Sequence, residues 1–399
     1  MAAPRILFLD HVAVLGGGEL SLLEIAAHFR SHARVVLFED GPFRKALQDR
    51  GVRTRVLRPV TSIAQVNRRG TLLSTATALP GLAHLVFQVA REARSADLLY
   101  ANSQKSMVVA ALAGAVARRP VVWHLRDLLR PEHFGWWTRT LAVTLANSLV
   151  THVIANSEAT RTAFVDAGGH PDRATVIHNG VNPSPFNDVE GMGSLRSDLG
   201  LPPDVPLVGV FSRLAPWKGQ HVLLHALDAL PEVHAVLVGE ALFGPDQEYA
   251  DALHRLVREK GLTDRVHFLG FRDDVPTLMK QVDIVAHTSV DPEPFGRVIV
   301  EGMLAETPVV ATAAGGAREI VRSGHNGLLV PPDDPASLRR ALQRLVEAPD
   351  WAHTLAERGR RTATTQFSHE SMLEKIDKRL HKTASLSSSA RSLFPTMLS

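Results

Sequence analysis

The segment 291–302 carries the most informative residues of this sequence. It reads D-P-E-P-F-G-R-V-I-V-E-G and follows a predicted strand. Its prolines and first glycine prevent a helix before about Gly296, so we expect the backbone amides of Phe295 and Gly296 at a helix N-terminus, where amides bind phosphate. A carboxylate is repelled by phosphate, and we therefore expect Glu293 and Glu301 to accept hydrogen bonds from hydroxyl groups on either side of it. The alternative is a pair of exposed carboxylates at a helix end.

Two cations lie in another predicted strand-to-helix loop. This loop, S-R-L-A-P-W-K-G, contains Arg213 and Lys218 and leads into a helix near Gln220. Arginine offers a planar fork and lysine a point charge, a combination that suits a diphosphate, and each charge-assisted hydrogen bond contributes about 1.5–3 kcal/mol. The loop lacks the Walker pattern G-x-x-x-x-G-K-[ST]. The alternative is two exposed surface cations.

Three glycines, Gly16, Gly17 and Gly18, follow the first predicted strand and open a helix. The free amides at such a helix N-terminus could hold an anion. The dinucleotide fingerprint G-x-G-x-x-G is broken at Ser21, although Glu39 lies near the spacing expected for a ribose-binding carboxylate. A nicotinamide site is therefore disfavoured, and a flexible turn is the alternative to an anion site.

His124 is predicted directly after the strand 121–123. Ligands of open parallel sheets bind outside the carboxyl ends of the strands, so this histidine is a candidate for chemistry. In a chain with 19 histidines, a packed or surface residue is the alternative. Arg126 and Asp127, which follow, are interpreted either as an ion pair or as a solvated turn.

The elements that must position these residues follow from hydrophobic patterning. Short runs rich in Val, Ile and Leu alternate with helical patterns, and many runs lack in/out alternation, which is typical of parallel strands covered on both faces. The fold class is therefore α/β, with two doubly wound sheets. Strands are predicted near 6–9, 35–38, 53–57, 98–100, 121–123, 153–155, 175–177, 207–211, 235–238, 266–269, 284–286, 309–311 and 328–330.

The 399 residues predict two domains. A linker is marked by N-P-S-P-F-N-D-V-E-G-M, with its prolines and turn residues. The predicted segments are an N-terminal domain at 1–181, the linker at 182–193, a second domain at 194–365, a helix at 366–382, and a Ser-rich tail at 383–399 that we expect to be disordered.

Composition excludes several classes of function. The net charge of +3 is too small for a nucleic-acid binder, and the absence of cysteine removes disulfides, thiolate catalysis and cysteine-ligated metal sites. No D-x-D or H-E-x-x-H pattern occurs, so no metal is expected. The longest apolar run, 107–117, is shorter than the ~20 residues that span a bilayer, and no signal peptide is recognised. A cytoplasmic protein is expected.

Three aromatic residues, Phe134, Trp136 and Trp137, are interspersed with arginines. Such a cluster could contact the inner face of a membrane and receive a lipid-linked substrate. Packing of the helix through Leu141 and Leu145 is the favoured interpretation.

Together these segments resemble glycosyltransferase family 4, from the first strand to about Phe367. The motifs E-P-F-G-R-V-I-V-E, S-R-L-A-P-W-K-G and A-A-G-G-A-R-E-I-V are specific in combination. The resemblance implies the GT-B fold, in which two Rossmann-like domains face each other across a cleft. It also implies a retaining transfer of sugar from a nucleotide-sugar donor, without a metal or other cofactor.

The resemblance assigns roles to the matching residues. Arg213 and Lys218 would bind the donor diphosphate, Glu301 the ribose, and Glu293 the transferred sugar. His124 would approach the reaction centre, and Gly17 and Gly18 the phosphate and acceptor. The donor-binding residues are Arg213, Lys218, Glu293, Phe295, Gly296 and Glu301; the glycine loop is Gly16, Gly17 and Gly18.

The sequence indicates several classes of acceptor for the transferred sugar. A sugar, a lipid-linked molecule or a small molecule would serve as acceptor, with polysaccharide or glycoconjugate biosynthesis as the leading hypothesis. A sugar synthase or phosphorylase acting on a small soluble acceptor, and a non-catalytic nucleotide-sugar-binding protein, are the alternatives. Neither the sugar, the nucleotide nor the oligomeric state follows from the sequence.

Overall fold

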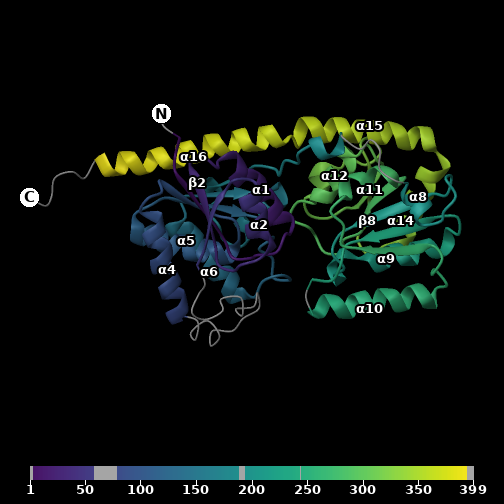
Figure 1. Cartoon of the computed structure of the whole chain (residues 1–399), viewed down its shortest axis with the longest axis horizontal. Helices are drawn as coiled ribbons and strands as arrows, with labels where there is room; N and C mark the ends of the chain where they lie inside the picture. The colour runs from purple at the N-terminus through teal and green to yellow at the C-terminus, as the bar shows by residue number, and fades with distance from the viewer. Residues whose placement is uncertain (1–2, 58–78, 188–193, 243, 393–399) are drawn as a thin grey trace, which may run out of the picture. The chain divides into compact units, whose positions relative to one another are not determined.

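A computed structural model of the protein describes residues 3–57, 79–187, 194–242 and 244–392. The chain forms two compact units (Figure 1). Unit 1 comprises Met1–Gly180 together with Glu370–Ser399, and unit 2 comprises Val181–His369. Each unit contains its own parallel sheet. Within the described residues, no helix combines the length and apolar character needed to cross a membrane.

Unit 1 is built on a seven-stranded sheet with the order β3-β2-β1-β4-β5-β6-β7. The chain begins in the middle, winds to one edge, and then returns to build the other half, so β1 and β4 flank the switch point. All of its neighbouring strands are parallel. The strands are β1 (Ile6–Asp10), β2 (Ala33–Leu37), β3 (Arg53–Val56), β4 (Leu98–Ala101), β5 (Val121–Leu125), β6 (His152–Ala155) and β7 (Ala174–Val176).

Helices cover both faces of this sheet, which explains why its central strands are continuously apolar. One core contains Leu85 of α4, Met107 of α5 and Ala142 of α6. The opposite core contains Leu22 of α1 and Ile376 of α16. The helices are α1 (Gly17–His28), α2 (Pro42–Asp49), α4 (Leu79–Ala93), α5 (Gln104–Ala117), α6 (Trp136–Leu149), α7 (Glu158–Asp166) and α16 (His369–Ser392).

Unit 2 repeats the arrangement with six parallel strands in the order β10-β9-β8-β11-β12-β13. Its switch point lies between β8 and β11, the position at which open α/β sheets bind ligands. The strands are β8 (Leu207–Phe211), β9 (His234–Val238), β10 (Val266–Gly270), β11 (Ile284–His287), β12 (Val309–Thr312) and β13 (Leu328–Val330).

The helices of unit 2 also form two layers. Leu223 of α9 and Leu342 of α14 belong to the core on one face, and Met279 of α11 and Met303 of α12 to the core on the other. The helices are α8 (Leu195–Asp198), α9 (Gln220–Ala226), α10 (Gly244–Glu259), α11 (Val275–Gln281), α12 (Arg297–Leu304), α13 (Ala317–Ile320), α14 (Pro335–Glu347) and α15 (Pro349–Gln366).

The predicted fold class is confirmed, and each predicted strand overlaps one of β1–β13. The C-terminal region differs from the prediction. Helix α16 continues to Ser392, into the segment 383–399 that we expected to be disordered, and Ala384 packs beside the core residues Ile376 and Leu380. Residues 393–399, and residues 188–193 of the predicted linker, lie outside the described residues.

Candidate functional site

Three loops interlock at the carboxyl edge of the unit 2 sheet. The loop after β8 ends at Lys218, whose backbone oxygen accepts a hydrogen bond of 2.8 Å from the Thr288 hydroxyl in the loop after β11. The amide of Val290 donates to the oxygen of Trp217 at 2.9 Å, and the amide of Gly316, in the loop after β12, donates to the oxygen of Glu293 at 2.9 Å. Hydrogen bonds between loops thus place Lys218 and Glu293 on either side of the switch point.

The Glu293 carboxylate is the centre of this site. Its Oε1 atom lies 2.5 Å from Lys218 Nζ, accepts a hydrogen bond of 2.5 Å from Ser289 Oγ, and lies 3.0 Å from His287 Nε2. The other ring nitrogen of His287 lies 3.3 Å from the hydroxyl oxygen of Thr312, at the end of β12. All five side chains are buried or half-buried. The carboxylate is therefore held in one position by partners from two loops and one strand end.

The charges around Glu293 keep it ionised. Burial on its own raises the pKa of this carboxyl, but Lys218 and His287 outweigh burial and lower the pKa well below its usual value. An ionised carboxylate only accepts hydrogen bonds. Glu293 therefore suits partners that donate or carry positive charge, such as Lys218, Ser289 and His287.

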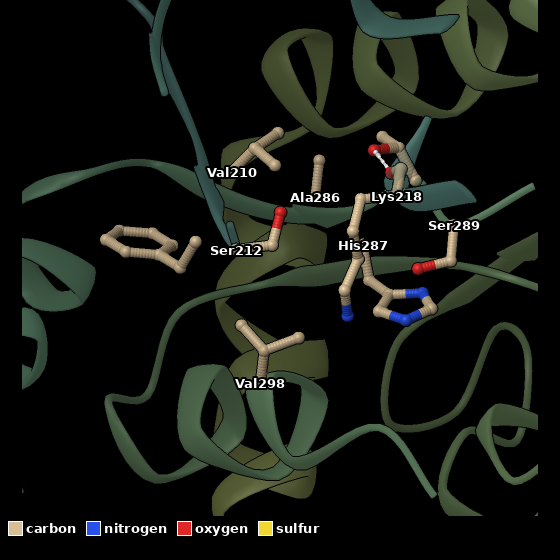
Figure 2. A pocket seen from close by; sticks show the side chains of 9 residues that line it. Val210, Ser212, Lys218, Ala286, His287, Ser289 and Val298 are labelled. Carbon is tan, nitrogen blue, oxygen red and sulfur yellow. Dashed lines mark hydrogen bonds between the residues drawn. The ribbon is translucent and has the colours of Figure 1, made fainter. Parts of the chain in front are cut away.

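A small pocket opens beside this cluster (Figure 2). Figure 2 shows Lys218, His287 and Ser289 on one side of it, with Val298 of α12 on another. The pocket is lined by Val210, Phe211, Ser212, Lys218, Ala286, His287, Thr288, Ser289 and Val298. Its polar groups converge from β8 and β11, as expected for a ligand site at a switch point.

Trp217 links the two predicted cations. Lys218 Nζ lies 4.2 Å from the centre of the indole ring, and Arg213 Cζ lies 5.5 Å from it. Arg213 Nε also lies 4.0 Å from an oxygen of the buried Asp246. The aromatic ring therefore stabilises two positive charges beside one pocket.

The helix that carries Glu301 begins where the sequence predicts. Gly296 precedes α12 in a left-handed conformation, with φ of 101°. The Phe295 side chain is buried against Phe367, with ring centroids 5.7 Å apart. Glu301 lies one turn into α12 and its Oε1 atom is 3.2 Å from Arg297 Nη2. Glu301 thus forms an ion pair with Arg297, whereas Glu293 contacts Lys218.

A polar network lies at the switch point of unit 1. Asn102, after β4, donates through Nδ2 to Asp10 Oδ2 at 2.6 Å and to the backbone oxygen of Gly18 at 3.3 Å. Arg126, after β5, donates to Asn102 Oδ1 at 2.7 Å and to Asn179 Oδ1 at 2.9 Å. These bonds tie the glycine loop to the ends of three strands and to the segment that follows β7.

Glu19 closes the glycine loop. Gly16 precedes α1, and its amide donates to Glu19 Oε2 at 3.1 Å. A Cβ atom on Gly16 would lie 2.8 Å from that oxygen, and one on Gly18 would lie 3.3 Å from Arg126 Cδ. Burial and the neighbouring Asp10 charge raise the pKa of Glu19 to about 7. This carboxyl therefore changes charge near neutral pH. It belongs to the loop for which the three glycines predicted an anion site.

The raised pKa of Glu19 gives a pH dependence with a definite sign. Between pH 4.5 and 7 the unfolded chain loses this proton while the folded chain keeps it, so rising pH lowers the free energy of unfolding, by about 3 kcal/mol in total. Glu19→Gln removes the titration but retains an oxygen for the Gly16 amide. Urea unfolding at pH 5 and pH 8 should show a smaller loss for Glu19→Gln than for wild type. Glu24→Gln, on the same helix, is the control, and equal losses in all three proteins would contradict the assignment.

His124 lies elsewhere than predicted. Strand β5 runs to Leu125, so His124 is inside the strand rather than after it, and its side chain is fully buried. Nδ1 contacts the Tyr100 hydroxyl and lies 3.1 Å from Arg126 Nη2, whereas Nε2 has no hydrogen-bond partner among the described residues. Burial and the Arg126 charge hold the pKa of His124 well below its usual value, so the ring is neutral.

Several residues of both sites were not singled out by sequence. His287 and Ser289 line the unit 2 pocket, Trp217 packs against Lys218, and Asn102 anchors the unit 1 network. The position of Asn102 directly after a predicted strand was a usable signal. Arg126, interpreted as one half of an ion pair or as a solvated turn, donates hydrogen bonds to two asparagines. Within the described residues, no group of three or more His, Cys, Asp or Glu is arranged to hold a metal ion.

Comparisons with known proteins cover both units. The family model described as "Glycosyl transferases group 1" matches residues 193–362, and the model "Glycosyl transferase 4-like domain" matches residues 16–180. The crystal structure of Anabaena Alr3699/HepE in complex with UDP-glucose is 42% identical to this chain, with a TM-score of 0.84, and the match covers 95% of this chain and 100% of that one.

Two curated relatives match over shorter stretches. The lipopolysaccharide core biosynthesis glycosyltransferase LpsE of Rhizobium meliloti is 36% identical over 45% of this chain and 51% of the relative. A D-inositol 3-phosphate glycosyltransferase of Stackebrandtia nassauensis is 33% identical over 62% of this chain and 57% of the relative. The matches thus span about half the length of these curated relatives.

Proposed function

Because this chain belongs to the group 1 glycosyl transferases, with a glycosyl transferase 4-like domain in its first half, we propose that it moves a sugar from a nucleoside-diphosphate donor to an acceptor hydroxyl. The observation that carries the proposal is the cluster of Lys218, His287 and Ser289 around the buried Glu293 carboxylate. A cation and an ionised carboxylate side by side suit a phosphate next to a hydroxyl-rich sugar.

The donor residues divide by chemistry. Arg213 and Lys218, on either side of Trp217, neutralise the diphosphate, helped by the amide end of α12. Glu293 accepts hydrogen bonds from the transferred sugar, and Glu301 from the ribose. Because the HepE complex contains UDP-glucose, a UDP-sugar is the first donor class to test.

The proposed reaction needs no enzyme nucleophile. The acceptor oxygen forms a bond to the anomeric carbon as the bond from that carbon to the donor phosphate breaks. The acceptor proton passes to the departing phosphate, and the nucleoside diphosphate leaves. Attack on the face that the phosphate occupied retains the anomeric configuration, as the family resemblance implies. Arg213 and Lys218 stabilise the charge that develops on the phosphate, a task that does not require a metal ion.

We assign the acceptor to unit 1, in the network of Asp10, Asn102 and Arg126 beside the glycine loop. A carbohydrate acceptor of glycoconjugate biosynthesis is favoured by the likeness to LpsE. A small phosphorylated acceptor is the second candidate, favoured by the likeness to the D-inositol 3-phosphate glycosyltransferases.

The experiment is a sugar-transfer assay with UDP-sugars and the two acceptor classes, in which the release of UDP is measured. We expect UDP release that depends on the acceptor, persists in excess EDTA, and gives a product whose anomeric proton coupling matches that of the donor. UDP-sugar binding without turnover on any acceptor would favour a non-catalytic binding protein, and an inverted product would exclude the retaining mechanism.

A further inference from the structure

Helix α16 carries a stripe of positive charge at the edge of the unit 1 sheet. Four basic side chains with the spacing i, i+3, i+4, i+7 line one pocket together with three residues of or next to β7, the last strand of the sheet order. We call this surface the basic groove. It consists of Lys375, Lys378, Arg379, Lys382, Thr175, Val176 and Ile177.

The nearby acidic residues of α16 leave most of this charge unbalanced. Glu374 pairs with Lys378 at 2.6 Å, on the exposed surface. The other acid of this stretch, Asp377, lies 3.2 Å from His381. In the part of the chain that the structure describes, the remaining three cations of the groove have no ion-pair partner: Lys375, Arg379 and Lys382.

Such a stripe is unfavourable for an isolated helix. Like charges three or four residues apart destabilise a helix by about 0.2–0.5 kcal/mol per pair. Lys375 faces Lys378 and Arg379 at these spacings, and Lys382 faces the same two residues. The apolar face of α16, with Met372 as an example, already attaches the helix to unit 1. The cations therefore add repulsion that packing does not require, and an anionic ligand would remove it.

The charge of the groove affects the pKa of a buried histidine. His152 lies on β6, and its Nε2 atom is 2.8 Å from the hydroxyl oxygen of Thr175 in the groove. Burial, and then the charges of Arg379 and Lys382, lower the pKa of His152 to about 4. The positive potential of the stripe thus acts on the pocket wall that a ligand would contact.

We propose that the basic groove binds a phosphate-bearing ligand, at a site separate from the donor residues of unit 2. Lysines supply point charges and Arg379 supplies a planar fork, the two groups that bind phosphate oxygens. The three unpaired cations and the half-buried Thr175 hydroxyl favour an ionic headgroup over an apolar one. Free phosphates and phospholipid headgroups share this chemistry, and the test separates them.

The test follows the His152 imidazole signal by NMR while the protein is titrated with sodium tripolyphosphate. In parallel, binding is measured to vesicles of phosphatidylcholine alone and of phosphatidylcholine mixed with phosphatidylglycerol. Because His152 is in contact with the groove through Thr175, its signal reports binding there. A bound anion should raise the pKa of His152, since it offsets the charges of Arg379 and Lys382.

The variant is Arg379→Glu/Lys382→Glu, and the matched control is Arg255→Glu/Arg258→Glu on the exposed face of α10. Each pair changes the formal net charge from +3 to −1. We expect the groove variant to bind at least about tenfold more weakly, and the control to bind as wild type does. Arg379→Gln/Lys382→Gln gives the same comparison if charge reversal disturbs folding.

The outcomes separate the two sources of phosphate. A His152 response to tripolyphosphate without vesicle binding identifies a soluble phosphate ligand. Vesicle binding that requires phosphatidylglycerol and is lost in the groove variant identifies a lipid headgroup. The proposal is overturned if neither probe binds wild type at the groove, or if the groove variant and the α10 control lose affinity equally.

Discussion

Lys218→Ala is expected to reduce sugar transfer by a factor of about 10²–10³. The substitution removes a charge that, in the proposed reaction, stabilises the phosphate as the bond to the sugar breaks, and the loss of one such preorganised group typically has this effect. The charge of Lys218 is also the largest single effect that lowers the pKa of Glu293, against the raising effect of burial. The variant should therefore bind UDP more weakly and hold the transferred sugar less firmly. Steady-state rates and calorimetric binding of UDP measure the two effects.

The same substitution should also destabilise the fold, because it breaks a buried ion pair. Both side chains are mostly buried, with 15% of Lys218 and 9% of Glu293 exposed. Breaking a buried pair commonly costs about 3–5 kcal/mol, and the contacts of Glu293 with His287 and Ser289 should keep the loss at the lower end. Lys218→Ala/Glu293→Gln should recover much of this stability but none of the activity. The double variant thus separates catalysis from folding.

The matched control is Lys260→Ala. This lysine also belongs to unit 2 and forms an ion pair, with Asp228, but it lies outside the pocket. We expect transfer by Lys260→Ala to stay within about twofold of wild type, since partly exposed pairs contribute little. If folded Lys218→Ala transferred sugar as fast as Lys260→Ala, Lys218 would not bind the donor phosphate.

Much of the fold could be predicted because local patterns and tertiary packing agree. Buried parallel strands require continuous apolar runs, and many such runs in the sequence are bounded by turn residues. The start of α12 is the sharpest case. Pro292, Pro294 and Gly296 exclude a helix before Arg297, and the helix begins at Arg297. Local chemistry therefore predicted that the Phe295 and Gly296 amides lie at the start of this helix.

Contacts between residues distant in sequence were not predictable in this way. Asn102 donates to Asp10 across 92 positions, and the bond depends on β1 and β4 being neighbours in the sheet. His287 ends an apolar strand and gave no sign of a polar role, because its partner Glu293 is brought back by the following loop. The packing of α16 against unit 1 was likewise not predictable, because the apolar face of this helix could cover any sheet face.

The predicted position of His124 was wrong because the predicted strand ended too early. The prediction ended the strand at Trp123, which would leave His124 in a loop, whereas β5 extends to Leu125. The continuation is driven by pairing with β6, where His124 is opposite Ile154. Hydrogen bonding with a neighbouring strand can lengthen a strand beyond its apolar run, and the polar side chain is then buried with its partners Tyr100 and Arg126.

Gly315→Ala is expected to destabilise unit 2 strongly, because among the glycines described there an added Cβ atom comes closest to another atom at Gly315. Gly315 has a φ of 57°, and a Cβ atom there would lie 2.0 Å from the backbone oxygen of Glu293. The left-handed conformation costs alanine about 1–2 kcal/mol, and an overlap of this kind adds about 1–3 kcal/mol. Because the overlapping atom is backbone, the overlap can be relieved only by moving Glu293 itself.

Gly261→Ala separates these two contributions. Gly261 has a φ of 63°, but a Cβ atom added there would have no other atom within 4 Å, so its substitution carries the conformational cost alone. Urea unfolding should show a larger loss for Gly315→Ala than for Gly261→Ala, and only Gly315→Ala should weaken UDP-glucose binding. Equal losses of stability with unchanged binding would mean that Glu293 is not held by the loop after β12. In the proposed mechanism Gly315 touches no donor group, whereas the Glu293 carboxylate does. A loss of binding confined to Gly315→Ala would therefore establish that the backbone at Gly315 sets the position of the Glu293 carboxylate.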